Sequence, residues 1–363
     1  MEEKIKVAIL FGGRSTEHEI SILSAQNVYK SLDTEKYEAI LIGIDKNGKW
    51  HYNADSINLL HSSDPRSISI ESVSHPVLFS QNNEEKKIIS LDTHETISRI
   101  DVIFPVLHGT FGEDGSVQGL AKLANIPCVG CGILGSAVGM DKDMMKRVLR
   151  DAGIAVADWE TVKYSSEGAD YNAISSKLGL ELFIKPANLG SSVGVSFSKN
   201  KHEFFEGLNN ALLYDHKVII EEKISGRELE CAVLGNENPE ASIPGEVIPT
   251  KDFYSYESKY LDEKGAVLKI PAELTEKEIK AIQDLAVDVY SLLECAGMAR
   301  VDMFMTDQGK LIINEINTIP GFTNISMYPK LWEFSGLSQE NLISELIRLA
   351  IDRHEKQNML KLS

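Results

Sequence analysis

The sequence predicts an α/β protein of two or three domains that begins with an open parallel sheet. The chain has 363 residues, and domains typically contain roughly 100 to 200 residues. Apolar residues make up 43% and charged residues 25% of the chain, as in ordinary globular proteins. Apolar runs typical of strands alternate with helix-like patterns over the first hundred residues, which favours an α/β fold.

The first predicted strand is the buried apolar run from Lys6 to Phe11. Apolar residues near helical spacing predict a helix from Ile20 to Leu32, and Tyr37 to Ile44 is typical of a second strand. Asn47-Gly48 predicts a hairpin turn. The stretch from Asn53 to Glu85 is polar and has no sustained period, so we expect a loop or short irregular elements there.

A second group of patterns surrounds a predicted domain boundary near residue 140. Asp101 to Leu107 predicts a buried strand, and Ser116 is positioned to cap a helix that extends to Asn125. The small residues from Gly130 to Gly139 lead into a helix that starts near Asp141 and is closed by Gly153.

The remaining chain predicts further strands and helices around a glycine- and serine-rich loop. The capping box Thr275-x-x-Glu278 predicts the start of a helix that extends to about Leu293. The other predicted elements are a strand at Leu182 to Ile184, the loop Asn188 to Gly194, a helix near His202 to Leu213, and strands at Lys217 to Glu221 and Glu228 to Leu234.

Charge and cysteine content exclude several classes of protein. The chain has 37 Lys and Arg against 54 Asp and Glu, a net charge of −17, which disfavours binding to nucleic acid or to an anionic membrane surface. Glu2 and Glu3 stand where a signal peptide would carry positive charge, so we expect a cytoplasmic protein. Cys128 and Cys131 have C-x-x-C spacing, but no second pair completes a metal site. We therefore expect them to be structural.

The segments Arg300 to Met305 and Leu311 to Asn317 predict a hairpin. If its loop is the two residues Gln308-Gly309, Asp302 lies opposite Glu315, Arg300 lies opposite Asn317, and all four share one face. A three-residue loop would put Asp302 and Glu315 on opposite faces. We favour the first register because it leaves the other face mostly apolar, with Val301, Met303, Met305, Ile312 and Ile316.

Two carboxylates and an amide oxygen on one face repel one another unless a cation lies among them. Oxygen ligands suit Mg²⁺, which commonly binds through a few carboxylates together with substrate phosphates. The hairpin thus predicts that Asp302, Glu315 and Asn317 hold Mg-ATP. An alternative that the hairpin alone leaves open is a solvated, salt-bridged pair of strands in which Arg300 neutralises both carboxylates.

Other residues favour the nucleotide. Lys142 at a helix start and Lys185 at a strand end are candidate partners for phosphate, and the loop from Asn188 to Gly194 offers glycines and hydroxyls to cover it. The sequence contains neither a P-loop motif nor a clean Gly-x-Gly-x-x-Gly after the first strand. A P-loop and an ordinary dinucleotide site are therefore excluded.

Over nearly its whole length the chain resembles the D-alanine–D-alanine ligases of the ATP-grasp superfamily. The segments that carry the resemblance are Phe11 to Ser21, His108 to Gly115, Met140 to Lys142, Ile184 to Pro186, Gly190 to Gly194 and Asn314 to Thr323. This resemblance implies an ATP-grasp fold behind an N-terminal open parallel-sheet domain. The implied domains are 1–140, 141–223 and 224–363.

The resemblance also implies the reaction, the ATP-dependent joining of two D-alanines for peptidoglycan precursor synthesis. The carboxylate of the first D-alanine attacks the γ-phosphate, and the amine of the second attacks the resulting acyl phosphate, so that ADP and phosphate are released. The implied metal is Mg²⁺, with two ions expected and Mn²⁺ able to replace them. By analogy with the family we expect a homodimer.

Residue roles follow from the same resemblance. Glu17 would bind the first ammonium, and Glu17, Ser191 and Tyr260 would form a hydrogen-bonded lid. Arg300 and the backbone N–H of Gly321 would stabilise the tetrahedral oxyanion. The other implied substrate residues are His108, Lys259 and Ser326, and the implied ATP-binding residues are Lys142, Lys185, Ser192, Glu221, Glu222, Ile224 and Glu228.

Four alternatives remain open, two for single segments and two for the whole chain. Glu221 and Glu222 are alternatively a charged strand end, and the aromatic stretch from Asp252 to Tyr260 is alternatively a packed surface loop. For the whole chain, one alternative is a nucleotide-binding regulatory module without turnover. Another is a ligase of the same fold whose second substrate is D-lactate or D-serine, although Tyr260 favours D-alanine.

Overall fold

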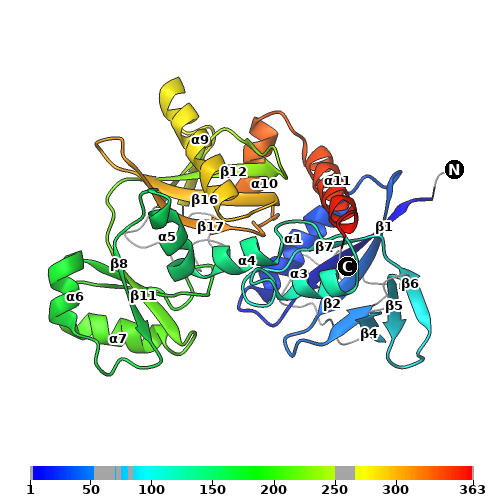
Figure 1. The fold of residues 1–363 in the computed structure, drawn as a ribbon, viewed down its shortest axis with the longest axis horizontal. Coiled ribbons are helices and arrows are strands. Elements are labelled where there is room, and N and C mark those ends of the chain that lie inside the picture. Colours follow the sequence, from blue (N-terminus) through cyan, green and yellow to red (C-terminus); the bar gives the residue numbers. More distant parts are fainter. Residues whose placement is uncertain (1–2, 53–69, 71–74, 81–84, 250–265, 362–363) are drawn as a thin grey trace.

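The computed structural model describes residues 3–52, 70, 75–80, 85–249 and 266–361. Figure 1 shows three sheet regions: the N-terminal sheet on the right, a small sheet at the lower left, and the C-terminal sheet above and between them. None of the described helices is long and apolar enough to cross a membrane.

The N-terminal sheet has seven strands in the order β6-β5-β4-β3-β2-β1-β7. β1 (Ile5–Gly12) pairs in parallel with β2 (Tyr37–Ile44) and with β7 (Val102–Pro105), as the buried runs predict. An antiparallel meander extends this parallel part and consists of β3 (Trp50–Tyr52), β4 (His75–Phe79), β5 (Lys87–Ser90) and β6 (Thr96–Arg99).

Helices cover both faces of the parallel part. Val7 and Ile9 pack in one core with α1 (His18–Lys30) and α11 (Gln339–Asn358), while Ala8 and Leu10 pack in another with α3 (Ser116–Leu123). The alternation arises because successive strand side chains point to opposite faces. The C-terminal helix α11 thus completes the core of the N-terminal sheet, as Figure 1 shows at the right.

The small sheet has the order β10-β9-β11-β8 with antiparallel pairs throughout. Two helices cover one of its faces, where Ile184 and Val218 pack against Phe204. The opposite face carries Lys185 and Glu221, which line the cavity of the candidate active site. Its elements are β8 (Trp159–Lys163), α6 (Tyr171–Leu178), β9 (Leu182–Pro186), β10 (Ser196–Ser198), α7 (Lys201–Ala211) and β11 (Lys217–Glu222).

The C-terminal sheet has the order β15-β14-β12-β16-β17, with β13 paired to β12. α9 packs on one face with α5, while α10 contacts β12. The predicted capping box is confirmed at Thr275 and Glu278. The elements are β12 (Arg227–Gly235), β13 (Glu240–Ala241), β14 (Gly245–Pro249), β15 (Ala266–Lys269), α9 (Glu276–Leu292), β16 (Gly297–Met305), β17 (Leu311–Asn317) and α10 (Met327–Phe334).

The β16–β17 hairpin contains both registers that the sequence left open. Near the turn, Met303 pairs with Ile313 and Met305 with Leu311, so the predicted two-residue loop is wrong. A β-bulge then shifts the register, and Asp302 pairs with Glu315 as predicted. Arg300 likewise lies opposite Asn317. The bulge therefore restores the pairing that the predicted site requires.

The bulge also changes one predicted face. Ile313 and Ile316 join Val301 in the apolar core, whereas Ile312 pairs with Phe304, which lines the site cavity. Ile312 was predicted on the apolar face, and this is wrong because the extra bulge residue reverses the alternation between Ile312 and Ile316.

Three local predictions also need correction. Within the stretch predicted as irregular, β4 is a strand because Val77 and Phe79 alternate into the core. Ser116 is the first residue of α3 and not its cap, because Asp114 accepts its backbone N–H. The small residues before 140 are themselves helical, in α4 (Ile133–Met140), and Asp141 then caps α5 (Lys142–Asp151).

Candidate active site

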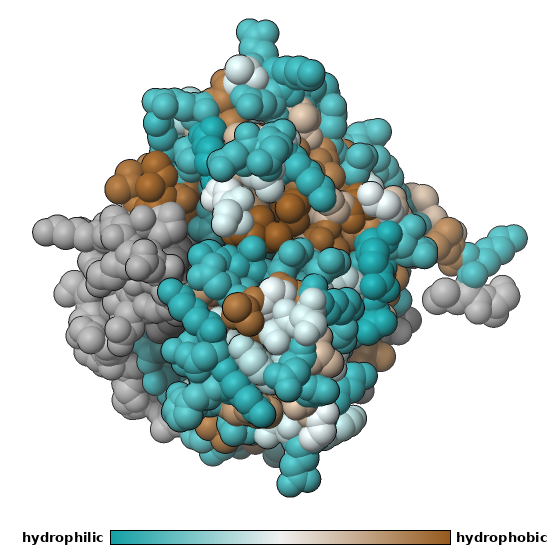
Figure 2. Space-filling view, turned by 90° about the vertical axis from the view of Figure 1, so that its left-hand side faces the viewer, coloured by the Kyte–Doolittle hydropathy of each residue, from teal (hydrophilic) through white to brown (hydrophobic). Residues whose placement is uncertain are grey.

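A cavity of about 600 Å³ lies between the small sheet and the C-terminal sheet. β9, β11 and the loop after β9 line one side, and β14, β16 and β17 line the other. A volume of this size is typical of a site for a small molecule or nucleotide. Figure 2 views the molecule from the end that carries the small sheet and shows a mostly hydrophilic surface with hydrophobic residues gathered between its upper and lower parts.

Lys142 enters the cavity from the start of α5. The Asp141 carboxylate accepts the backbone N–H of Met144 at 3.1 Å and so fixes where the helix begins. The Lys142 ammonium donates to the Leu189 carbonyl at 2.8 Å and lies 3.3 Å from Glu315 Oε2. It therefore joins the glycine- and serine-rich loop to the carboxylate hairpin.

Lys185 enters from β9 and shares a buried carboxylate with a second lysine. Its ammonium lies 2.5 Å from Glu221 Oε2, and Lys146 lies 2.6 Å from Glu221 Oε1. Burial raises the pKa of Glu221, but the charges of Lys146 and Lys185 outweigh it and lower that pKa to about 2. Glu221 is 3% exposed, so the reading as a charged strand end is wrong for this residue.

The loop between β9 and β10 places two serines at the cavity. Ser191 and Ser192 line it with φ of 52° and 59°, in the left-handed region that non-glycine residues seldom adopt. Ser191 Oγ donates to Glu17 Oε1. Because Glu17 lies at the start of α1, this bond joins the loop of the small sheet to the N-terminal part of the chain.

Glu17 is a buried carboxylate held against two glycines. A Cβ at Gly109 would lie 2.8 Å from Glu17 Oε2, and one at Gly190 would lie 3.1 Å from the same atom. Nearby, burial and then the charge of Glu17 raise the pKa of Glu113 to about 8. Glu113 nevertheless accepts backbone N–H groups from Gly109 at 2.8 Å and Ile319 at 3.2 Å. It thereby links the loop of Gly109, which approaches Glu17, to the loop of Ile319 that follows β17.

His108 lies buried beside this pair. Its Nδ1 contacts the Ile319 carbonyl at 3.2 Å, and its Nε2 contacts Ser24 Oγ at 3.0 Å. Burial lowers the pKa of His108 to about 4, so the ring is neutral at pH 7, with Nδ1 as the donor and Nε2 as the acceptor. Nδ1 thus connects the N-terminal part to the loop before α10, and Nε2 contacts Ser24 of α1, whose Oγ accepts the backbone N–H of Phe322 in that loop.

A row of carboxylates crosses three neighbouring strands around Arg300. Glu230 on β12 pairs with Asp302, which pairs with Glu315. Arg300 donates to both Asp302 oxygens at 2.7 Å and lies 2.8 Å from Glu230 Oε2. Asn317 donates to Asp302 at 3.0 Å. Arg300 thus pairs with both Asp302 and Glu230, so one negative charge of this group remains, while Glu315 faces Lys142.

The predicted metal ligands are therefore brought together. Asp302, Glu315 and Asn317 share one face and offer two carboxylates and one amide oxygen. This set of oxygen ligands fits Mg²⁺. The described parts of the chain contain no group of three or more His, Cys, Asp or Glu side chains that could hold a metal, so this donor set depends on the amide of Asn317 beside two carboxylates. The four cysteines are free and buried, as the structural reading of Cys128 and Cys131 predicts.

Gly321 and Ser326 meet at the start of α10. A Cβ at Gly321 would lie 2.7 Å from Ser326 Oγ, so only glycine allows this approach. Ser326 Oγ accepts the backbone N–H of Thr323 at 2.9 Å. Of the other predicted residues, Glu222, Ile224 and Glu228 line the cavity, and Lys259 and Tyr260 lie outside the described residues.

Four residues of this site were missed from the sequence: Lys146, Glu113, Glu230 and Asn314. Asn314 contacts Lys185 at 3.4 Å and lines the cavity next to Glu315. Lys146 had a usable signal, because it occupies an apolar position of α5 one turn after Lys142. Glu113 and Asn314 lie in segments that carry the family resemblance, which could have indicated them, whereas Glu230 depends on the pairing of β12 with β16, which no local pattern shows.

Two sheets that enclose a cavity lined by lysines, a glycine- and serine-rich loop and a carboxylate hairpin define an ATP-grasp protein. Comparisons with known proteins agree. The family described as D-ala D-ala ligase N-terminus matches residues 6–131, and D-ala D-ala ligase C-terminus matches residues 148–348. The chain therefore belongs to the D-alanine–D-alanine ligase family.

Individual relatives support this assignment over the full length. D-alanine–D-alanine ligase from Oceanobacillus iheyensis is 50% identical and ligase A from Escherichia coli is 48% identical, each covering 99% of both chains. The solved Coxiella burnetii D-alanine–D-alanine ligase has a TM-score of 0.85 at 43% identity, covering 98% of this chain and 97% of its own. The VanG D-Ala:D-Ser ligase from Enterococcus faecalis has a TM-score of 0.86 at 38% identity, covering 96% and 100%.

Proposed function

We propose that this protein joins two D-alanine molecules to D-alanyl-D-alanine at the expense of ATP. The observation that carries the proposal is that the cavity brings Lys142 and Lys185 near the carboxylate hairpin, while Ser191 in its wall donates a hydrogen bond to Glu17 of the N-terminal part. A nucleotide-binding module without turnover would need neither Glu17 nor Arg300. The family membership supports the same conclusion.

ATP is expected to lie in the cavity with its phosphates toward Lys142, Lys185 and Ser192. The ammonium groups offer charge that suits phosphate oxygens. Backbone groups from Glu222 to Ile224 would read the adenine edge, Glu221 would support this segment, and Glu228 would accept the ribose hydroxyls. All of these residues line the cavity.

The substrate roles follow from charge and position. Glu17 would bind the ammonium of the first D-alanine, whose carboxylate attacks the γ-phosphate. The amine of the second then attacks the acyl phosphate, loses a proton and displaces phosphate. Arg300 and the Gly321 N–H would stabilise the oxyanion, while Ser326 and Lys259 would hold the second carboxylate. His108 would shape the substrate side, and Tyr260 would join the lid with Ser191.

Asp302, Glu315 and Asn317 would hold Mg²⁺, for which we propose two ions with Mn²⁺ as a substitute. When bound, the metal would neutralise charge that develops during phosphoryl transfer. Arg300 orients the Asp302 carboxylate through two hydrogen bonds of 2.7 Å. Lys142 lies 3.3 Å from Glu315 and helps to position that carboxylate.

We further propose three domains, at 1–140, 141–223 and 224–363, and a cytoplasmic homodimer. The separation into three sheets supports the domains, although α11 packs in the core of the first. The homodimer rests on analogy with the family.

The test is phosphate release from ATP in the presence of Mg²⁺ and D-alanine, D-lactate, D-serine or L-alanine, with products identified by mass spectrometry. We expect release that depends on D-alanine and yields the dipeptide. A mixed product formed with D-serine alone would instead indicate a D-Ala:D-Ser ligase, the activity for which the similar VanG ligase is named. ATP binding without release would contradict the proposed function.

A further inference from the structure

Lys146 is a fully buried lysine next to the nucleotide cavity but not part of its wall. It lies in the apolar stripe of α5 between Met145 and Leu149, and all three side chains are 0% exposed. Burying an ammonium in such a place is costly unless it is paired. The structure must therefore hold Lys146 there through specific partners.

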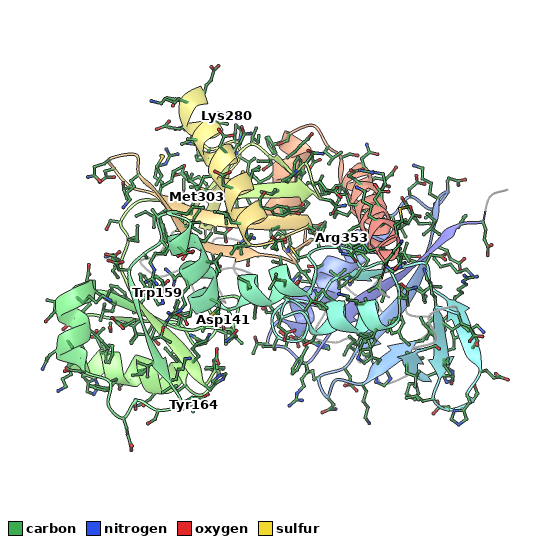
Figure 3. The ribbon with its side chains drawn as sticks, viewed as in Figure 1. Asp141, Trp159, Tyr164, Lys280, Met303 and Arg353 are labelled. Carbon is green, nitrogen blue, oxygen red and sulfur yellow. The ribbon has the colours of Figure 1, made fainter. Side chains whose placement is uncertain are left out.

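Those partners all belong to the small sheet and the segment that leads into it. Its Nζ lies 2.6 Å from Glu221 Oε1, donates to the Ala157 carbonyl at 3.0 Å and lies 5.4 Å from the Trp159 ring centroid. Figure 3 labels Trp159 where α5 meets the small sheet. Lys146 thus approaches Glu221 from α5 and lies behind the cavity wall, since Ala157 and Glu221 line the cavity and Lys146 does not.

Glu221 accepts a different lysine on each oxygen. Lys185 holds Oε2 at 2.5 Å and also contacts Asn314 at 3.4 Å, in the cavity wall. Two ammonium groups and one carboxylate carry a net charge of +1. If Lys146 were absent, Glu221 and Lys185 would form a neutral pair, and the attraction of Lys185 for an anion in the cavity would be largely cancelled.

We propose that Lys146 is a positioning residue for nucleotide binding: by neutralising Glu221 from outside the cavity, it leaves the charge of Lys185 to the polyphosphate of ATP. This inference rests on the proposed binding of ATP in the cavity. It is distinct from the roles of Lys142 and Lys185, because Lys146 itself touches no substrate.

The test measures binding of ATP, ADP, AMP and adenosine by calorimetry, together with kcat and KM. In Lys146→Met we expect ATP affinity to fall at least about tenfold, as for truncation of a buried charge pair. The loss should shrink with each phosphate removed and vanish for adenosine. Lys146→Arg should keep most of the affinity. Lys177→Met, which removes an exposed lysine paired with Glu160 in the same region, should change nothing.

A double variant separates the charge effect from damage to the fold. In Lys146→Met/Glu221→Gln both buried charges are gone, so Lys185 keeps its charge and ATP binding should recover relative to Lys146→Met. Equal losses for ATP and adenosine, or no recovery in the double variant, would overturn the inference. If the wild-type protein itself failed to bind ATP, the proposed function would fail instead.

Discussion

At the scale of single residues, Glu315 connects the carboxylate hairpin, a lysine and the cavity wall. It pairs with Asp302 across the hairpin, faces Lys142 at 3.3 Å and lines the cavity. We expect Glu315→Gln to lower kcat by roughly a hundredfold or more, because the neutral amide loses the charge that the metal requires. Phosphate release measures the loss.

The control for this variant is its folded state. The melting temperature should stay close to that of the wild type, because Gln keeps the shape of Glu. Near-normal turnover in Glu315→Gln would exclude the metal assignment.

His108 makes stability depend on pH. Burial lowers its pKa from 6.5 to about 4, so between these values the unfolded chain binds a proton that the folded chain does not. The folded protein therefore has its full stability with respect to His108 above pH 6.5, and its free energy of unfolding decreases as pH falls toward 4. The shift corresponds to about 3 kcal/mol.

We expect the free energy of unfolding of the wild type to fall by up to that amount relative to His108→Gln as pH falls through this window. Urea denaturation at several pH values measures it. The raised pKa of Glu113 changes the free energy of unfolding in the opposite direction as pH falls. Both proteins contain Glu113, so its effect cancels in the comparison. Parallel curves for the two proteins would disprove the effect.

At the scale of elements, the capping box of α9 is a local feature that can be tested apart from catalysis. The Thr275 N–H and hydroxyl both donate to Glu278 Oε2 at 2.7 Å. We expect Thr275→Ala to lower the free energy of unfolding by about 1 kcal/mol and to leave turnover unchanged, since the cap lies outside the cavity. Lys277→Ala is the matched control on the same exposed turn, and an equal loss there would rule out the cap as the cause.

At the scale of the whole molecule, Arg353 ties the C-terminal helix to the segment between the N-terminal sheet and α4. It donates to the carbonyls of Cys128 at 2.8 Å and Gly130 at 2.7 Å. Figure 3 labels it on α11 above the N-terminal sheet. We expect Arg353→Met to lower the free energy of unfolding by about 2 kcal/mol, because hydrogen bonds from a charged donor to half-buried carbonyls are lost.

The comparison for this prediction is Arg348→Met on the same helix. Arg348 pairs only with Glu345 and Asp352 and is 55% exposed, so its removal should cost less than about 0.5 kcal/mol. Chemical denaturation of both variants measures the two losses in the free energy of unfolding. If both lost the same stability, the clamp on Cys128 and Gly130 would contribute nothing.

The sequence alone predicts the elements whose signal is local. β1 and β2 follow from continuous apolar runs, α9 from its capping box, and the hairpin from two strands around a glycine turn. The main site residues on these elements could also be named, because charged side chains at the ends of buried strands and beside glycine-rich loops are unusual. Family resemblance then supplied their roles.

Only the tertiary structure decides which of these residues meet. The β-bulge at Asn314 lets the hairpin have a three-residue loop and still pair Asp302 with Glu315. The sequence does not show this bulge, because the side-chain alternation of the strand reveals no single extra residue. The same holds for Lys146, whose charge is balanced by Glu221, 75 residues along the chain. Burial sets the cost of a charge and distant partners offset it, so sequence patterns determine the elements and packing determines the electrostatics of the site.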